Sequence, residues 1–213
     1  MSPAPLPHIP VMGPWHRLHR AEAAILAVLL SQAERAAVRR RLNPGLDPDL
    51  NLGLNHAQGP SDALATWIPA TAGPAGSRFC APLGPGALYL GNDLATCLAE
   101  VAYHHGRACA ASLGTPPGTR ATLRHLLFQV SGTLADAARD RRQRLHDPFT
   151  YAPSWAYGRQ VRAEHLPGIH ARSVRKRGGR CLAIFQPQPL RRPRPEGGVV
   201  ILEWDGTTSR CLA

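Results

Sequence analysis

Lysine and aromatic residues are scarce in this 213-residue chain, and each scarcity narrows the possible functions. Lys176 is the single lysine, yet 25 basic residues outnumber 14 acidic ones and give a formal charge of +11. A near-complete preference for arginine, together with abundant alanine, can follow from genome base composition as readily as from function. The charge is therefore compatible with a solvated basic surface, or with arginine forks that bind phosphate groups or an acidic partner.

Aromatic residues make up 6% of the chain and are spread along it. They provide no stacking platform for single-stranded nucleic acid, and the sequence has no helix-turn-helix or RNA-binding signature. Composition alone supports a nucleic-acid-binding or RNA-cleaving protein that would use the basic surface with His104 and His105. We keep this alternative open but do not expect direct nucleic-acid binding.

Cysteine is limited to five residues, an odd number, with no Cys-x-x-Cys pair. This argues against a disulfide framework and structural zinc, so we expect no metal. Cys97 and Cys181 lie in apolar stretches, as buried thiols of a reducing compartment do. The longest apolar run, 23–30, is too short to span a bilayer. Arg17 and Arg20 precede it as in a signal peptide, but the proline-rich leader favours a cytoplasmic protein without a membrane partner.

The length fits one ordinary domain, or one domain with an appendage, and excludes two large domains. Four prolines among residues 1–13 predict an extended arm, and further prolines make residues 43–84 loop-like. The predicted parts are an extended N-terminal arm at 1–20, a segment at 21–64 with a helix at 21–42, a main domain at 65–206 and a C-terminal tail at 207–213.

Strands and helices of the main domain follow one another in mixed order. Strand candidates lie at 87–90, 126–130, 169–173, 181–185 and 199–204, and helix candidates at 133–145 and 153–165. A further helix is expected to begin after Asn92 or Asp93, either of which can cap it. This order predicts an α+β fold in which helices cover the sheets, rather than a doubly wound parallel sheet.

The helix after Asp93 has a polar flank beside its apolar face. Thr96, Glu100 and His104 are spaced by four residues and therefore lie in line along that flank. The neighbouring apolar face consists of Leu94, Leu98 and Val101. A functional site is expected on the flank.

The chain has no phosphate loop, dinucleotide-binding glycine motif, nucleophile elbow or His-Glu-x-x-His. It carries instead a linear series of short motifs. In order they are Gly76-Ser77-Arg78-Phe79, Leu88-Tyr89-Leu90, the segment 93–100 that ends in Glu100, Tyr103-His104-His105, Gly168-Ile169, Ser173-Val174-Arg175 and the segment 178–187. This order resembles the RES domain, a bacterial family named for an arginine, a glutamate and a serine. The resemblance covers roughly residues 65–206, about two-thirds of the chain.

The resemblance implies a fold related to ADP-ribosyltransferase toxins, with a core of small packed β-sheets flanked by helices. It also implies an enzyme that acts on NAD as its substrate and needs no metal. Members of the family are toxins of toxin–antitoxin pairs that consume NAD by hydrolysis or phosphorolysis, or transfer ADP-ribose to a protein. A protein antitoxin is therefore the implied partner, and residues 65–206 are the implied catalytic domain.

The family motifs map onto particular residues of this chain. By resemblance, the catalytic residues are Glu100, Arg78 and Ser173, and the NAD-binding residues are Arg78, Tyr89, Phe79 and Arg17. Arg17 is a weak counterpart of a second family arginine near the start of the domain. The family often continues its Arg-Phe with small polar residues, whereas this chain has Cys80-Ala81-Pro82, a departure that bears on the shape of the Arg78 loop.

These residue types suit cleavage of the bond between nicotinamide and ribose. The ribose becomes oxocarbenium-like in the transition state, so a fixed carboxylate such as Glu100 stabilises charge that develops only there. Arg78 offers a planar charged fork to the pyrophosphate. Tyr89 offers a ring for nicotinamide with a hydroxyl for orientation. Ser173 can hydrogen-bond the ligand or hold Glu100 in one rotamer.

Each residue also has a structural interpretation. Glutamates on helices commonly pair with arginines, Tyr89 can belong to the core, and His104 with His105 can be a surface pair. The basic cluster can be a solvated hairpin or can seat an acidic antitoxin segment. That cluster consists of Arg172, Arg175, Lys176, Arg177 and Arg180. A non-catalytic scaffold of the same fold is thus a further alternative.

Overall fold

The computed structural model describes residues 6–20, 64–65, 67–112, 114–139, 144–191 and 193–212. The helix predicted at 21–42 lies outside these residues. Within them, no helix combines the length and the apolar character needed to cross a bilayer.

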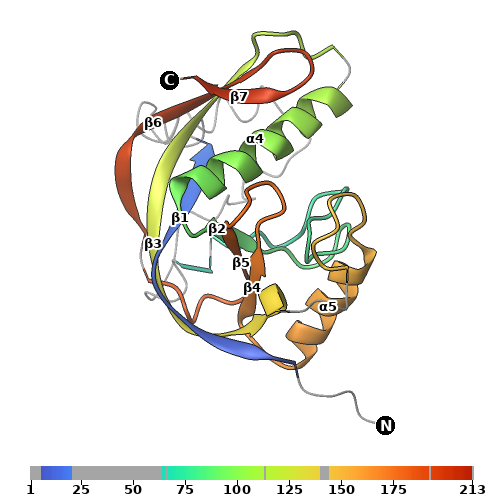
Figure 1. Cartoon of the computed structure of the whole chain (residues 1–213), viewed down its shortest axis with the longest axis vertical. Coiled ribbons are helices and arrows are strands. Elements are labelled where there is room, and N and C mark those ends of the chain that lie inside the picture. The colour runs from blue at the N-terminus through green and yellow to red at the C-terminus, as the bar shows by residue number, and fades with distance from the viewer. Residues whose placement is uncertain are drawn as a thin grey trace, which may run out of the picture.

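A mixed β-sheet forms the centre of the described structure (Figure 1). Its strands run in the order β1 (His8–Arg20), β2 (Leu88–Gly91), β5 (Arg180–Ile184), β4 (Gly168–Arg172), β3 (Arg120–Asp136), β6 (Arg194–Trp204) and β7 (Ser209–Leu212). Because β1 also pairs with β3, the pairings among β1, β2, β5, β4 and β3 close into a ring. The fold is α+β, as the sequence predicts.

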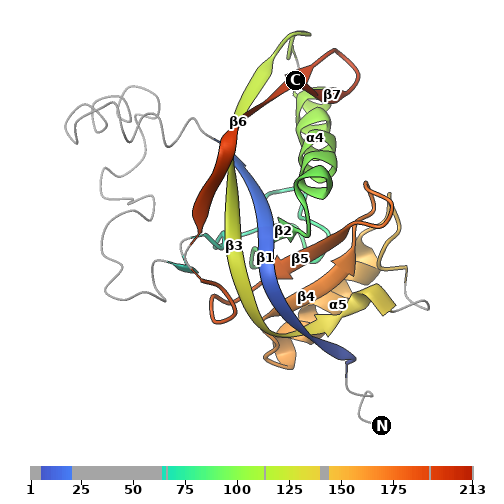
Figure 2. The same cartoon turned by 60° about the vertical axis from the view of Figure 1, so that its left-hand side comes forward.

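The long ladder between β1 and β3 is the largest difference from the predicted elements. All 13 residues of β1 pair antiparallel with β3, from His8 opposite Ala135 to Arg20 opposite Leu123. The two strands curve side by side over the length of β1, and β3 continues beyond it beside β6 (Figure 2). The predicted arm is therefore extended but built into the sheet. Its prolines are tolerated because β1 pairs with β2 only at His16, which leaves its other edge almost free.

Two helices were predicted close to their observed positions. α4 (Leu94–Ala111) begins after Asp93, whose Oδ1 accepts a hydrogen bond from Thr96 N at 2.6 Å. It packs against β1, β2, β6 and β7 on the concave side of the curved strands (Figure 1). α5 (Ala152–Ala163) has its proline in the first turn, where no amide donor is needed.

The helix predicted at 133–145 is wrong. Residues 133–136 continue β3, and the short 3₁₀ turn η1 (Ala137–Arg139) is the one helical element among the described residues that follow up to 145. Leu134 and Ala135 are fully buried and pair with β1, and Ala135 also pairs with β4. Strand pairing with two distant segments therefore overrides the local helical preference.

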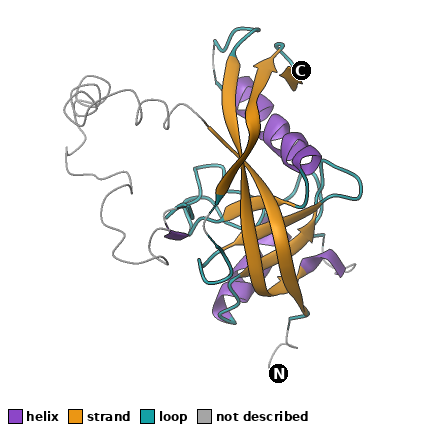
Figure 3. Ribbon diagram, turned by 90° about the vertical axis from the view of Figure 1, so that its left-hand side faces the viewer, coloured by secondary structure: helices purple, strands orange, loops and turns teal. Residues whose placement is uncertain are grey.

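The remaining strand predictions are confirmed for β2, β4, β5 and β6, although β3 and β6 are longer than expected. β7 lies in the predicted tail and pairs with β6. Figure 3 shows how strands dominate the described residues, with the helices set against them. All five cysteines are free in the structure, and burial raises the pKa of the Cys97 thiol to about 11.

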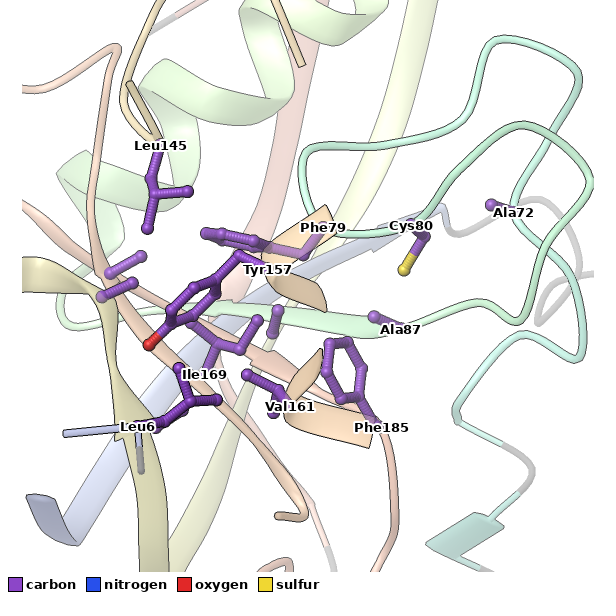
Figure 4. Close-up of a cluster of buried hydrophobic side chains, with 14 residues drawn as sticks. Leu6, Ala72, Phe79, Cys80, Ala87, Leu145, Tyr157, Val161, Ile169 and Phe185 are labelled. Atoms are coloured by element: carbon purple, nitrogen blue, oxygen red, sulfur yellow. The ribbon is translucent and has the colours of Figure 1, made fainter. Parts of the chain in front are cut away.

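Side chains along β2 point alternately to the two faces of the sheet, and this determines which of them face the candidate active site. Leu88 and Leu90 join a buried cluster shared with β1, β3 and β5, whereas Tyr89 between them faces the opposite side. On that side a second cluster packs α5 against β4 and β5 (Figure 4). Its members include Phe79, Tyr157, Val161, Ile169 and Phe185. Gly158 has no side chain, which lets α5 lie directly against the Phe79 carbonyl group.

Candidate active site

A pocket of about 590 Å³ lies where α4, β1, β2, β5 and the 76–79 loop meet. Its volume is in the range of small-molecule sites. The sequence-predicted residues on its wall include Arg17, Arg78, Phe79, Tyr89, Glu100, His104 and His105. Apolar side chains of β1, α4, β3 and β6 complete the wall, including Leu18, Val101, Leu123 and Leu202. The fold thus brings together residues that are up to 185 positions apart in the sequence, from Arg17 to Leu202.

One oxygen of the Glu100 carboxylate is held in place. Oε1 accepts hydrogen bonds from Ser173 Oγ at 2.7 Å and Val174 N at 3.3 Å, and the Cys181 thiol points at it from 3.8 Å. Every hydrogen bond from the described residues to this carboxylate goes to Oε1. Oε2 therefore remains available to a ligand in the pocket.

Ser173 can give its proton only to Glu100. Its oxygen already accepts the amides of Arg175 at 3.2 Å and Lys176 at 3.0 Å, so its single O–H points at Oε1. Ser173 itself does not lie on the pocket wall. Of its two predicted roles, the geometry matches the one in which it holds Glu100 in one rotamer.

The turn that carries Ser173 is fastened to the first turn of α4. Asn92 Oδ1 accepts hydrogen bonds from Arg180 N at 2.7 Å and from Thr96 Oγ1 at 3.1 Å. A Cβ atom on Gly179 would lie 2.6 Å from Thr96 Oγ1, so only glycine permits this approach. Sequence analysis missed this contact, although the Gly178-Gly179 pair was a visible sign of close backbone packing.

Arg78 is held by the loop that precedes α5. Its Nη1 donates to the carbonyl oxygens of Leu145 at 3.0 Å and Asp147 at 2.9 Å, and its guanidinium lies 4.6 Å from the centroid of the Tyr151 ring. Both hydrogen bonds use the same nitrogen. Donors on Nε and Nη2 therefore remain for a ligand.

The Tyr89 hydroxyl fastens the Arg78 loop. It lies 2.8 Å from Ser77 Oγ and accepts the Phe79 amide at 3.1 Å. Trp155 of α5 adds a hydrogen bond to the Ser77 carbonyl at 2.8 Å. Burial raises the pKa of Tyr89, so its phenol stays protonated. The ring lines the pocket, whereas the hydroxyl, which the sequence analysis assigned to orienting a ligand, is engaged by the loop.

Phe79 reaches the pocket wall, yet its side chain belongs to the core. It is 3% exposed and lies 6.4 Å from the Tyr157 ring, centroid to centroid (Figure 4). It therefore anchors the loop next to Arg78 more than it offers surface to a ligand.

Arg17 projects from β1 into the same pocket. Its Nη1 donates to the Tyr89 carbonyl at 3.0 Å, while its Nε is buried without a hydrogen-bond partner among the described residues. Burial lowers the pKa of Arg17, and no carboxylate of the described residues bonds to it. A buried cation with an unused donor is an environment that favours an anionic ligand.

The basic cluster is only partly a solvated hairpin. The Arg175 guanidinium lies 3.4 Å from the centroid of the Tyr103 ring and donates to the Pro148 carbonyl at 2.9 Å. Arg172, Lys176 and Arg177 are exposed. Among the residues with a described placement, no three His, Cys, Asp or Glu side chains are arranged to hold a metal ion.

Comparison with known proteins shows the family to which the chain belongs. A family model described as the RES domain matches residues 54–205, more than half of the sequence. The chain therefore belongs to the RES domain family, as the motif order predicts. No curated protein sequence matches it.

Among solved structures, the fold is similar to one in the crystal structure of the M. tuberculosis MbcT–MbcA toxin–antitoxin complex. The similarity has a TM-score of 0.50 and covers 89% of this chain and 86% of the other, at 15% sequence identity. At this low sequence identity, the similarity shows a shared fold and nothing further.

Proposed function

We propose that this protein is an NAD-consuming enzyme that cleaves the bond between nicotinamide and ribose, and that it acts as the toxin of a toxin–antitoxin pair. One observation carries the proposal: a carboxylate fixed by Ser173 shares a pocket with two arginines that retain free donors. Membership of the RES family and the fold shared with a toxin–antitoxin complex support it.

The residues fit NAD in distinct roles. Arg17 and Arg78 supply donors to the pyrophosphate, and the Tyr89 ring supplies an apolar surface for nicotinamide. Glu100 places Oε2 beside the ribose. As the bond to nicotinamide breaks, its electron pair leaves with nicotinamide, which becomes neutral, and the positive charge moves to the ribose. The Glu100 carboxylate stabilises that charge until an acceptor attacks C1′.

The group that accepts ADP-ribose can be water, phosphate or a protein side chain. The experiment that tests the proposed activity therefore offers each of these acceptors in turn. Purified protein is incubated with NAD in phosphate-free buffer, in phosphate buffer and with cell protein. We expect release of nicotinamide in at least one condition. The second product is ADP-ribose when water is the acceptor, phosphorylated ADP-ribose when phosphate is the acceptor, and an ADP-ribosylated protein when a side chain is the acceptor. Intact NAD in all three conditions would contradict the proposed activity and favour a binding scaffold.

The proposed antitoxin is expected to carry an acidic segment. No Asp or Glu occurs between residues 165 and 195. The exposed Arg172 ends β4, and the exposed Lys176 and Arg177 lie on the following turn, which holds Glu100. An acidic segment across this turn would cover Arg78 and close the pocket.

Binding of the product of a neighbouring small open reading frame tests this expectation. We expect a complex that weakens as salt is raised, because its charges become screened, and that protects NAD from consumption. A product that forms no complex even at high concentration and low salt would count against the antitoxin.

A further inference from the structure

We propose that His104 is the general base of this reaction, which accepts the proton of a neutral acceptor, water or a hydroxyl group, as its oxygen attacks C1′ of the ribose. The inference rests on the proposed function and adds a catalytic residue to it. It follows from the proton balance of the reaction and from the position of His104 in the pocket.

The reaction requires only one proton transfer. Nicotinamide takes the electron pair of the broken bond and leaves as a neutral molecule, so it needs no acid. A water molecule that forms the new C1′–O bond must lose a proton. Glu100 is poorly suited to receive it, because protonation would remove the charge that stabilises the ribose cation. A second group near the ribose is therefore required.

Three imidazoles line the pocket, and they differ in their partners and in their positions relative to Glu100. Nδ1 of His105 lies 2.7 Å from Ser209 Oγ, and the His19 ring packs edge-on against Trp67 with centroids 5.3 Å apart. The His104 ring likewise lies edge-on to the Tyr103 ring, with centroids 5.3 Å apart, and makes no hydrogen bond to another described residue. Unlike His19 on β1, His104 lies on α4, four residues after Glu100. Both of its nitrogens are thus available to an acceptor.

His104 follows Glu100 by four residues on α4, so the two side chains lie one turn apart on the same flank. An acceptor bound between them can touch the imidazole while the ribose faces Glu100. His104 is exposed at the rim, which lets the captured proton pass on to solvent. Glu100 beside it stabilises the imidazolium formed in the step.

The surroundings keep this imidazole in its basic form. Its pKa lies below the ordinary value of 6.5, chiefly because surrounding protein atoms desolvate it although its surface stays open at the rim. The charges of Arg175, Arg107 and Arg78 lower the pKa further, while Glu100 raises it. The ring is therefore largely neutral at pH 7 and can accept a proton.

The test compares His104→Gln with the neighbouring His105→Gln, whose amide can still bond Ser209. With water as the acceptor, we expect nicotinamide release by His104→Gln to fall tenfold or more at unchanged KM, with His105→Gln near wild type. The wild-type rate should rise with pH and level off near neutrality, because only neutral imidazole is active. That rise should be absent from His104→Gln.

Azide distinguishes a base from a structural residue, because it is an anion with no proton to lose. With azide as acceptor, His104→Gln and the wild type should react at equal rates, and imidazole should restore part of the lost hydrolysis to His104→Ala. A folded His104→Gln protein with the wild-type rate and pH profile would overturn the inference. An equal loss with azide and with water would also overturn it. A wild-type protein that releases no nicotinamide would overturn the proposed function, and this inference with it.

Discussion

Replacing Glu100 with glutamine should lower nicotinamide release about a hundredfold or more while leaving NAD affinity nearly unchanged. Glutamine keeps the size of the side chain, and its carbonyl oxygen can still accept the Ser173 hydroxyl. The change removes the negative charge, which matters most when the ribose is cationic. The melting temperature should also be close to that of the wild type, because α4 packs into a buried cluster through Leu94 and Leu98, which do not line the pocket.

Glu203→Gln is a matched control for this variant. Glu203 pairs with Arg120 at 2.9 Å on the sheet, away from the pocket, so its loss should leave turnover unchanged. Melting temperature, NAD affinity and nicotinamide release are measured for all three forms. If Glu100 is only structural, Glu100→Gln will melt earlier but retain full activity per folded molecule, and the mechanism proposed above fails.

Arg78→Lys should weaken NAD binding roughly ten- to a hundredfold, although it conserves the charge. Loss of charge-assisted hydrogen bonds to the pyrophosphate corresponds to about 1.5–3 kcal/mol. Arginine can bond the carbonyls of Leu145 and Asp147 through Nη1 and still present other donors to the ligand. A lysine ammonium has no such planar fork and cannot perform both tasks with the same geometry.

Calorimetric titration of NAD measures this effect, and the Glu100→Gln background prevents consumption of the ligand during the titration. Arg120→Lys on β3 is the control, because this exposed arginine pairs with Glu203 on the sheet. Equal NAD affinities with and without the Arg78→Lys substitution would show that Arg78 does not bind the pyrophosphate. The buried and partly unpaired Arg17 would then be the better candidate for the pyrophosphate.

Local patterns were enough to predict most elements that carry the site. The cap at Asp93, the polar flank with Glu100 and the alternation around Tyr89 all depend on residues within one turn or one strand. The same patterns could not show that residues 8–20 pair with β3, because that ladder joins segments more than 100 residues apart. For the same reason they misassigned residues 133–136, whose conformation is decided by β1 and β4.

The order of motifs indicated which residues belong to the site, but only the fold explains how they meet. Ser173 and Glu100 are 73 residues apart and are joined because Asn92 and Gly179 fix the turn against α4. Neither contact follows from a helical or strand periodicity in the sequence, so local patterns do not predict either of them. The hydroxyl of Tyr89 is a further example, since its partners at Ser77 and Phe79 depend on the loop closing over β2.

The most direct measurement of the central claim is chromatographic quantification of nicotinamide released from NAD by the purified, partner-free protein. We expect one nicotinamide for each NAD lost, with release reduced to near background in the Glu100→Gln form at the same concentration. NAD that stays intact with the folded wild-type protein, or release that is equal in the two forms, would contradict the account.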